Sequence, residues 1–263
     1  MKDRVGFTNK VLEIIEPVGM YYLTITLGMF VAQFFFGASN ESYMLCKIIG
    51  SLVALPVVCL YYIADLKRIG QYGKKWPFSM QMLKNILLVT VITICISVSL
   101  NNIISMSPLV TVSDEYDKVS NAFYGSTILL ELLGSAFITP LLEEVLHRGV
   151  VYIRLRRSMN MWPAVIVSAF VFAALHFNVV QFTYAFLLGI VFALFTEKTG
   201  HIYPAVLAHI VANGIAVIRT ETGFLSSTVD GTVSAWLISV GLLLIGLGIL
   251  IIYVGKKESK KWQ

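Results

Sequence analysis

Long apolar runs recur along the whole sequence and limit how this chain can fold. A helix needs about 20 predominantly apolar residues to cross the hydrocarbon core of a bilayer. The runs are too long and too continuous for the alternating pattern of a membrane β-strand. The sequence therefore predicts an all-α, polytopic membrane protein, a bundle of about eight transmembrane helices. The eight runs cover residues 18–38, 44–64, 80–104, 122–145, 161–177, 180–196, 202–219 and 233–254.

The composition leaves little room for a soluble domain. Of the 263 residues, 57% are hydrophobic and only 13% are charged. The stretches between the apolar runs are shorter than about 20 residues, whereas domains seldom have fewer than about 50. We therefore expect residues 1–263 to form a single transmembrane domain. Residues 1–17 carry too many charges for a cleaved signal peptide, so the first run should stay in the protein.

A helix break is expected near Pro17. Residues 11–15 combine apolar side chains with a charged one, which predicts a short helix lying at the membrane interface. Because proline cannot donate a helical hydrogen bond, Pro17 should end that helix.

The basic residues are divided unevenly between alternate loops. One side receives only Lys118 and Arg219, and the other receives sixteen lysines and arginines. Cytoplasmic loops carry such an excess, so we expect a multi-pass protein of the bacterial plasma membrane with both termini in the cytoplasm. These charges would attract anionic lipid, and no nucleic-acid partner is expected. The sixteen are Lys2, Arg4, Lys10, Lys67, Arg68, Lys74, Lys75, Arg148, Arg154, Arg156, Arg157, Lys198, Lys256, Lys257, Lys260 and Lys261.

Two adjacent acids, Glu143 and Glu144, interrupt the apolar pattern. A carboxylate at membrane depth costs about 3 kcal/mol, and such acids mostly face a bundle interior or a wet cavity. Glu144 and Arg148 are four residues apart and can pair on one helix face. Glu143 points about 100° away. We expect a bidentate Arg148 to hold Glu144 and to leave Glu143 free for chemistry, with a purely structural ion pair as the alternative.

His176 is the next polar residue, at the end of the fifth apolar run. If the chain turns near residues 158–160, Glu143 lies about 16 residues before the turn and His176 about 17 after it. At about 1.5 Å per residue, both are roughly 24 to 26 Å from the turn and should lie level in an antiparallel hairpin. This requires the helix of Glu143 to continue through Arg154, with a kink at Pro140.

His209 and Asn213 form the third polar cluster. They are four residues apart and share one helix face. Because polar groups in lipid seek one another, the three clusters should converge on one intramembrane polar cavity. A buried polar contact without chemistry is the alternative for His209.

Four other polar residues are weaker candidates. His147 follows Glu143 by four residues and could ligate a metal with it, but an interfacial position is favoured. Lys47 and Lys84 lie near the ends of apolar runs and are expected to extend to the lipid interface. Glu131 is either an interfacial acid or part of the cavity wall.

The ordered set of motifs resembles that of the CPBP (Abi) family of intramembrane proteases, which includes the type II CAAX prenyl endopeptidases and bacteriocin-immunity proteins. Each motif is weak alone, but the set inside eight apolar runs is specific. The motif-bearing catalytic core covers residues 125–219. The motifs are Glu143-Glu144-x-x-x-Arg148, Phe172-x-x-x-His176 and His209-x-x-x-Asn213.

The resemblance implies peptide-bond hydrolysis within the membrane. It implies that Glu143 and His176 activate water and that His209 and Asn213 hold the oxyanion. The second acid and the arginine of the first motif fall where support of the site is expected. The chemistry is reasonable, because a desolvated carboxylate is a good general base and an oxyanion donor typically adds about 10²- to 10³-fold in rate.

A zinc mechanism is the alternative to a glutamate-type endopeptidase without a cofactor. Glu143, His176 and His209 could be three zinc ligands, with water in the fourth position. The His-Glu-x-x-His signature of soluble zinc proteases is absent. The three cysteines have no metal-ligand spacing and are expected to be free thiols.

A non-catalytic role is the alternative to any protease. An immunity or regulatory protein could bind a peptide or a membrane partner through the same polar cavity. The expected partners are a membrane-associated peptide or protein substrate and the lipid bilayer. No residue of the motifs specifies a prenylated substrate.

Overall fold

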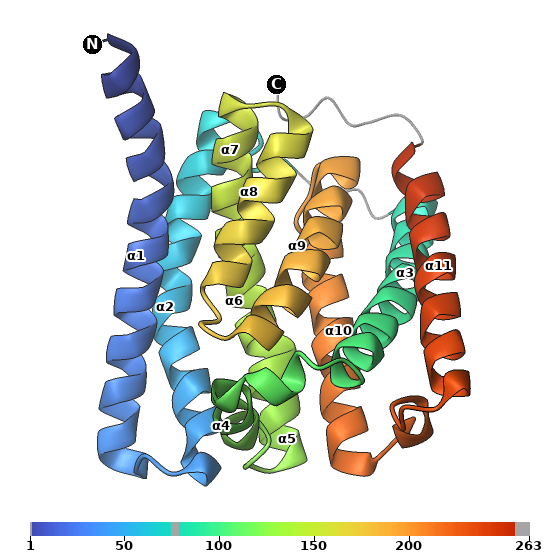
Figure 1. The fold of residues 1–263 in the computed structure, drawn as a ribbon. Coiled ribbons are helices and arrows are strands. Elements are labelled where there is room, and N and C mark those ends of the chain that lie inside the picture. Colours follow the sequence, from blue (N-terminus) through green and yellow to red (C-terminus); the bar gives the residue numbers. More distant parts are fainter. Residues whose placement is uncertain (1, 75–78, 256–263) are drawn as a thin grey trace.

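The computed structural model describes residues 2–74 and 79–255, and all regular structure in these two segments is helical (Figure 1). This confirms the prediction of an all-α fold. In the list that follows, η1 and η4 are 3₁₀-helices, and η2 and η3 are π-helices. The elements are α1 (Lys2–Phe36), α2 (Asn40–Arg68), α3 (Met80–Ser105), η1 (Val110–Val112), α4 (Asp114–Phe123), α5 (Ile128–Glu131), η2 (Leu132–Ile138), α6 (Thr139–Leu146), η3 (His147–Tyr152), α7 (Ile153–Ser158), α8 (Met161–Ala174), α9 (Val179–Thr199), α10 (Tyr203–Thr222), η4 (Ser226–Thr228) and α11 (Val233–Gly255).

The helices have the lengths of a polytopic membrane protein. Within the described segments, six helices are long and apolar enough to cross a bilayer: α1, α2, α3, α9, α10 and α11. A further span is formed if α4 is taken together with the helix from Ile128 to Ser158, although the two are bent by 110°. The fifth predicted run gives only the 14-residue α8, because the chain turns at Leu175.

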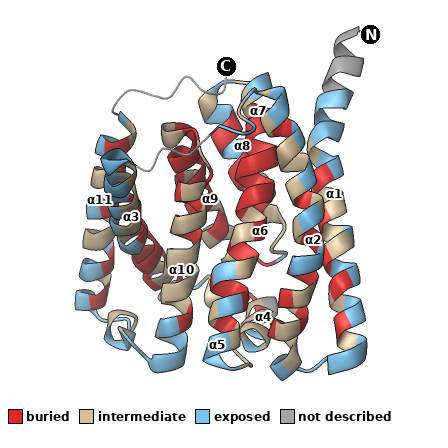
Figure 2. Ribbon diagram, turned by 180° about the vertical axis from the view of Figure 1, so that it is seen from behind, coloured by how far each residue is buried: buried red, intermediate tan, exposed pale blue. Residues whose placement is uncertain are grey.

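The bundle has two helix pairs at its edges and the motif-bearing helices between them (Figure 1). Helix α1 packs on α2 at one edge, and α11 packs on α3 at the other. Burial increases toward the middle: 56% of the apolar window of α9 is buried, against 22% in α1 and in α11. Figure 2 shows the buried residues gathered in the central helices. The motifs therefore lie on the helices between the two edge pairs.

The helix that carries the two acids runs without interruption from Ile128 to Ser158, as the predicted hairpin requires. Helix α6 lies between the π-helical segments η2 and η3. In η2, the Thr139 N–H donates to the carbonyl of Gly134, five residues earlier. The next donor in that register would be Pro140, which has no N–H. The carbonyl of Ser135 is therefore left without a helical partner, and the irregularity predicted at Pro140 is a π segment.

Pro17 lies inside α1 and does not end it, so the predicted break is wrong. The missing N–H of Pro17 removes the helical donor to the carbonyl of Glu13, four residues earlier. Arg154 compensates: its Nη1 donates to that carbonyl at 2.5 Å, and its Nε donates to Asp65 at 2.7 Å. A side chain from α7 thus completes the hydrogen bonding of α1 at its proline.

Candidate active site

A cavity of about 410 Å³ is lined by residues of the motif-bearing helices and of α1, α2, α3 and α4, and we call it the central cavity. Glu143, His176, His209 and Asn213, the four residues predicted to be catalytic, all line it. Of the described side chains that line it, Glu143 is the one acid and Lys47 the one lysine or arginine. Six tyrosines form much of the remaining polar wall: Tyr21, Tyr22, Tyr43, Tyr116, Tyr124 and Tyr184.

Glu144 and Arg148 form a fully buried ion pair beside this cavity. Arg148 Nη1 lies 2.8 Å from Glu144 Oε1, and both side chains have no exposed surface. The pair is not the expected bidentate one, because Nη2 donates instead to the carbonyl of Gly189 at 3.0 Å. The guanidinium also lies over the rings of Phe172 and Phe192, 4.7 and 5.4 Å from their centroids. Arg148 therefore ties α6 to α8 and α9.

His209 connects the two acids. Its Nδ1 lies 2.8 Å from Glu144 Oε1, and its Nε2 lies 3.8 Å from Glu143 Oε2. The Glu143 side chain is 15% exposed, whereas that of Glu144 is fully buried. Glu143 therefore reaches the cavity, and Glu144 serves as an acceptor for Arg148 and His209. The contact between Glu144 and His209 was not predicted, because the two residues are 65 positions apart and no spacing rule relates them.

The hydrogen bonds of His209 define where its proton lies. Glu144 accepts a hydrogen bond from Arg148 as a carboxylate, so it also accepts from the His209 ring. His209 Nδ1 must then carry the hydrogen. Nε2 has a lone pair in the neutral ring and an N–H in the imidazolium, and it is directed toward the carboxylate of Glu143.

His176 lies in the turn between α8 and α9. Its Nδ1 donates to the carbonyl of Phe172 at 3.1 Å, so the neutral ring has its lone pair on Nε2. Neighbouring contacts support this turn. The Tyr22 hydroxyl donates to the carbonyl of Leu175 at 2.8 Å, and the Asn178 side chain accepts from the Gln181 N–H at the start of α9.

Asn213 is held by the carbonyl that Pro140 leaves free. The Asn213 side-chain amide donates to the carbonyl of Ser135 at 2.8 Å. In the π register of η2, that carbonyl would accept from residue 140, which is a proline. The amide nitrogen has a second hydrogen, and its oxygen can accept. Pro140 and Asn213 thus act together on one backbone group, a relation that the sequence spacing did not indicate.

His147 is buried and not interfacial as predicted, with 1% of its surface exposed. It lines the central cavity. Its Nδ1 lies 2.8 Å from the backbone carbonyl of Glu143, and its ring meets that of Phe172 edge-on at 5.0 Å. The spacing of four residues from Glu143 was the signal for it, since positions four apart share a helix face.

The sequence predicted that Lys47 extends to the lipid interface and left two positions open for Glu131, the interface or the cavity wall. Lys47 lines the central cavity, and its Nζ lies 3.9 Å from the centroid of the Phe123 ring. This differs from the expected extension to the lipid interface. Glu131 is fully buried, and its Oε1 accepts from the Ser126 N–H at 3.1 Å. It is not among the described residues that line the central cavity.

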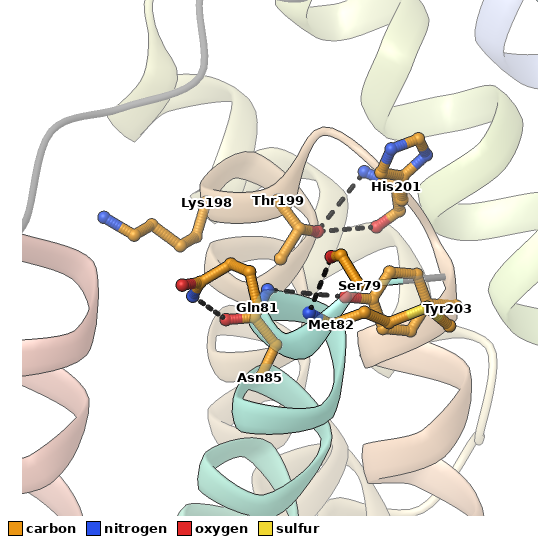
Figure 3. Close-up of a pocket in the computed structure, with 8 residues that line it drawn as sticks. All are labelled: Ser79, Gln81, Met82, Asn85, Lys198, Thr199, His201 and Tyr203. Atoms are coloured by element: carbon orange, nitrogen blue, oxygen red, sulfur yellow. Dashed lines mark hydrogen bonds between the residues drawn. The ribbon is translucent and has the colours of Figure 1, made fainter. Parts of the chain in front are cut away.

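A second, smaller pocket of about 270 Å³ lies where the start of α3 meets the junction of α9 and α10 (Figure 3). His201 and Lys198 line it, and the Thr199 hydroxyl bonds to His201 there. None of the described residues that line it is an acid or belongs to the three motifs. The motif residues that reach a described pocket therefore do so in the central cavity.

The three residues that the zinc alternative requires, Glu143, His176 and His209, are not placed as a three-ligand metal site among the described residues. Among the residues that the structure describes, no three His, Cys, Asp or Glu side chains are placed to hold a metal ion. His209 uses Nδ1 for Glu144, which leaves only Nε2 for another partner.

Residues 125–215 match the family model described as type II CAAX prenyl endopeptidase Rce1-like. The matched residues include all three motifs. The resemblance drawn from the motifs is thereby confirmed. The "Putative membrane peptidase YdiL" of Bacillus subtilis (strain 168) is 26% identical over 89 residues, which are 34% of this chain. The match spans 36% of that relative's length. No solved structure matches the chain.

Proposed function

We propose that this protein is an intramembrane endopeptidase that hydrolyses a peptide bond of a membrane-associated peptide or protein. The observation that carries the proposal is that two adjacent acids lie in different environments and contact different groups. Glu143 is partly exposed to the central cavity and lies near His209 Nε2, while Glu144 is buried between Arg148 and His209. The match of residues 125–215 to the Rce1-like family model and the relative named as a membrane peptidase support the same reaction class.

Glu143 is the proposed general base. Water is a weak nucleophile, and a carboxylate in a partly desolvated cavity can take its proton as the oxygen attacks the substrate carbonyl. His176 supports this step because its Nδ1 is engaged by the Phe172 carbonyl, which leaves Nε2 to accept a proton. The proton then passes to the amine as the carbon–nitrogen bond breaks. The products are a carboxylic acid and an amine.

His209 and Asn213 are the proposed oxyanion donors. The second hydrogen of the Asn213 amide is available for the oxyanion, because the first is used by Ser135. His209 would donate from Nε2 as an imidazolium, while its Nδ1 stays bonded to Glu144. Glu144 and Arg148 would hold the His209 ring in place. This is the supporting role that the family resemblance implies for the second acid and the arginine of the first motif.

The proposal is tested by comparing membrane peptides in cells that express the wild type or Glu143→Gln, using mass spectrometry. A peptide that accumulates only with the variant is then synthesised and incubated with each purified protein. We expect Glu143→Gln and His176→Ala to lower cleavage by about 10²-fold or more, the usual contribution of a general base or acid.

Glu131→Gln is the matched control, because Glu131 is a buried acid outside the lining of the central cavity and glutamine can still accept from Ser126. It should cleave like the wild type. Full cleavage by Glu143→Gln would contradict the proposal, and a cellular effect that survives this substitution would favour a non-catalytic immunity or regulatory protein. Loss of cleavage in a metal chelator, restored by zinc, would instead favour the metal-dependent alternative.

A further inference from the structure

Lys47 is a cation in the central cavity that has no anion beside it. Of the described side chains that line the cavity, it is the one lysine or arginine. Its Nζ lies 3.9 Å from the centroid of the Phe123 ring, and Lys47 forms no hydrogen bond or ion pair with any residue that the structure describes. An ammonium has three donors, and a charge held away from water needs an anion or strong hydrogen bonds. An aromatic ring meets this need only in part, so the cation indicates an anionic ligand.

The ammonium group of Lys47 is accessible from the central cavity. Phe123, over whose ring it lies, lines the same cavity. Nζ has no hydrogen-bond partner but is not among the buried side-chain atoms of the described residues, so it retains accessible surface. It interacts electrostatically with Glu143 and His176, the two residues proposed to activate water. Helix α2, which carries Lys47, packs on both α4 and α6. Lys47 thus lies within electrostatic reach of the proposed base without contacting it.

Tyr43 supplies a second donor on the same helix face. It precedes Lys47 by four residues, and positions four apart are neighbours on a helix. It lines the central cavity, and its ring centroid lies 5.7 Å from that of Phe123. Its hydroxyl has no hydrogen-bond partner among the described residues and is not among their buried atoms. A carboxylate has two oxygens and can accept from an ammonium and a hydroxyl at once. The two side chains therefore suit a carboxylate.

We propose that Lys47 binds a carboxylate of the substrate peptide, with the Tyr43 hydroxyl as a second donor. An acidic side chain and the C-terminus present the same group, so either can be its source. A carboxylate at membrane depth is costly and pairs with a cation where it can. Glu143, the one acid among the described lining residues, contacts His209 and leaves the ammonium free. The inference rests on the proposed function and adds a specificity determinant, because the bond that lies beside Glu143 depends on its distance from that carboxylate.

Neutralising each carboxylate of the peptide in turn tests this contact. The peptide is the one that accumulates with Glu143→Gln; its C-terminus is converted to an amide, each aspartate to asparagine and each glutamate to glutamine. One of these changes should raise the KM of the wild type about tenfold. The same change should leave the KM of Lys47→Gln unaltered, because the contact is already lost in that variant. The position of the effect distinguishes an acidic side chain from the C-terminus.

Two further variants define the site. Tyr43→Phe removes only a hydroxyl and should raise the KM for the unmodified peptide about threefold. A wild-type KM in this variant would contradict the part assigned to Tyr43. Lys84→Gln is the control, because Lys84 is an exposed lysine of α3 outside the described lining of the cavity. It should depend on each peptide carboxylate as the wild type does.

The outcomes distinguish this inference from the proposed function. If no neutralised carboxylate changes the KM of the wild type, or if each changes it equally in Lys47→Gln, the role of Lys47 is overturned and the protease stands. Lys47 would then be a structural cation that packs on Phe123. Absence of cleavage by the wild type would overturn the proposed function and this inference with it.

Discussion

Glu143 and Glu144 are neighbours in sequence but occupy different environments. Successive helical residues point about 100° apart, which directs Glu143 to the central cavity and Glu144 to the packed interior. The different directions of the two side chains could be predicted from the sequence, because they depend on helical geometry alone. The bond from His209 to Glu144 could not, because it depends on how α10 packs on α6.

Loss of the buried carboxylate should destabilise the protein. Glu144→Gln leaves the charge of the fully buried Arg148 without its counter-charge, and breaking such a pair costs about 3 to 5 kcal/mol. Thermal unfolding of the purified protein in detergent would measure this. Glu143→Gln makes the same chemical change at a partly exposed site and should unfold near the wild-type temperature. Equal unfolding of the two variants would contradict the assigned roles.

At the scale of the element, the π segment η2 relates Pro140 to the proposed oxyanion site. Pro140 leaves the Ser135 carbonyl free, and Asn213 donates to it. The sequence predicted a kink at Pro140, because the effect of proline on a helix is local. It could not predict the partner of the freed carbonyl, since Asn213 comes from a helix that begins more than 60 residues later.

Replacing this proline should therefore weaken the site without weakening the fold. In Pro140→Ala, residue 140 gains an N–H that competes with Asn213 for the Ser135 carbonyl, so we expect kcat to fall by about tenfold or more, as for a displaced oxyanion donor. Thermal stability should stay equal or rise. Kinetics and unfolding of the same preparation would test both. Pro56→Ala in α2 is the control, because that proline is exposed and lies outside the lining of the cavity; an equal loss of kcat there would refute the coupling.

At the scale of the whole molecule, the sequence predicted the ends of the bundle at which the first helix begins and the last helix ends. It did not predict where each helix stops along the bundle. Helix α1 begins and α11 ends at the same end of the bundle, as expected from the charge distribution (Figure 1). Helix α8 is shorter than its apolar run. The run did not predict where the helix ends, because hydropathy shows which residues tolerate an apolar environment and not where the chain turns. The sequence predicted, from the number of residues on each side of the turn, that His176 lies level with Glu143 in the hairpin. In the structure, both residues line the central cavity.

The predicted orientation can be measured by cysteine labelling in intact cells. Ser226→Cys in η4 should react with a membrane-impermeant maleimide, and Ser158→Cys at the end of α7 should react only after permeabilisation, because the basic end of the bundle is expected in the cytoplasm. Both serines are exposed. The wild type, with its three native cysteines, gives the background. The opposite labelling pattern would reverse the assignment of the two sides.

The shortness of α8 also concerns the lipids around the protein. Its 14 residues extend about 21 Å, whereas a bilayer has a hydrocarbon core about 30 Å thick. Phe177, in the turn below it, has 78% of its surface exposed. The bilayer beside this face borders a helix shorter than its hydrocarbon core, and a bilayer adapts to such a mismatch by thinning. A bilayer of longer acyl chains would therefore be deformed most beside α8, which carries the Phe172 of the second motif.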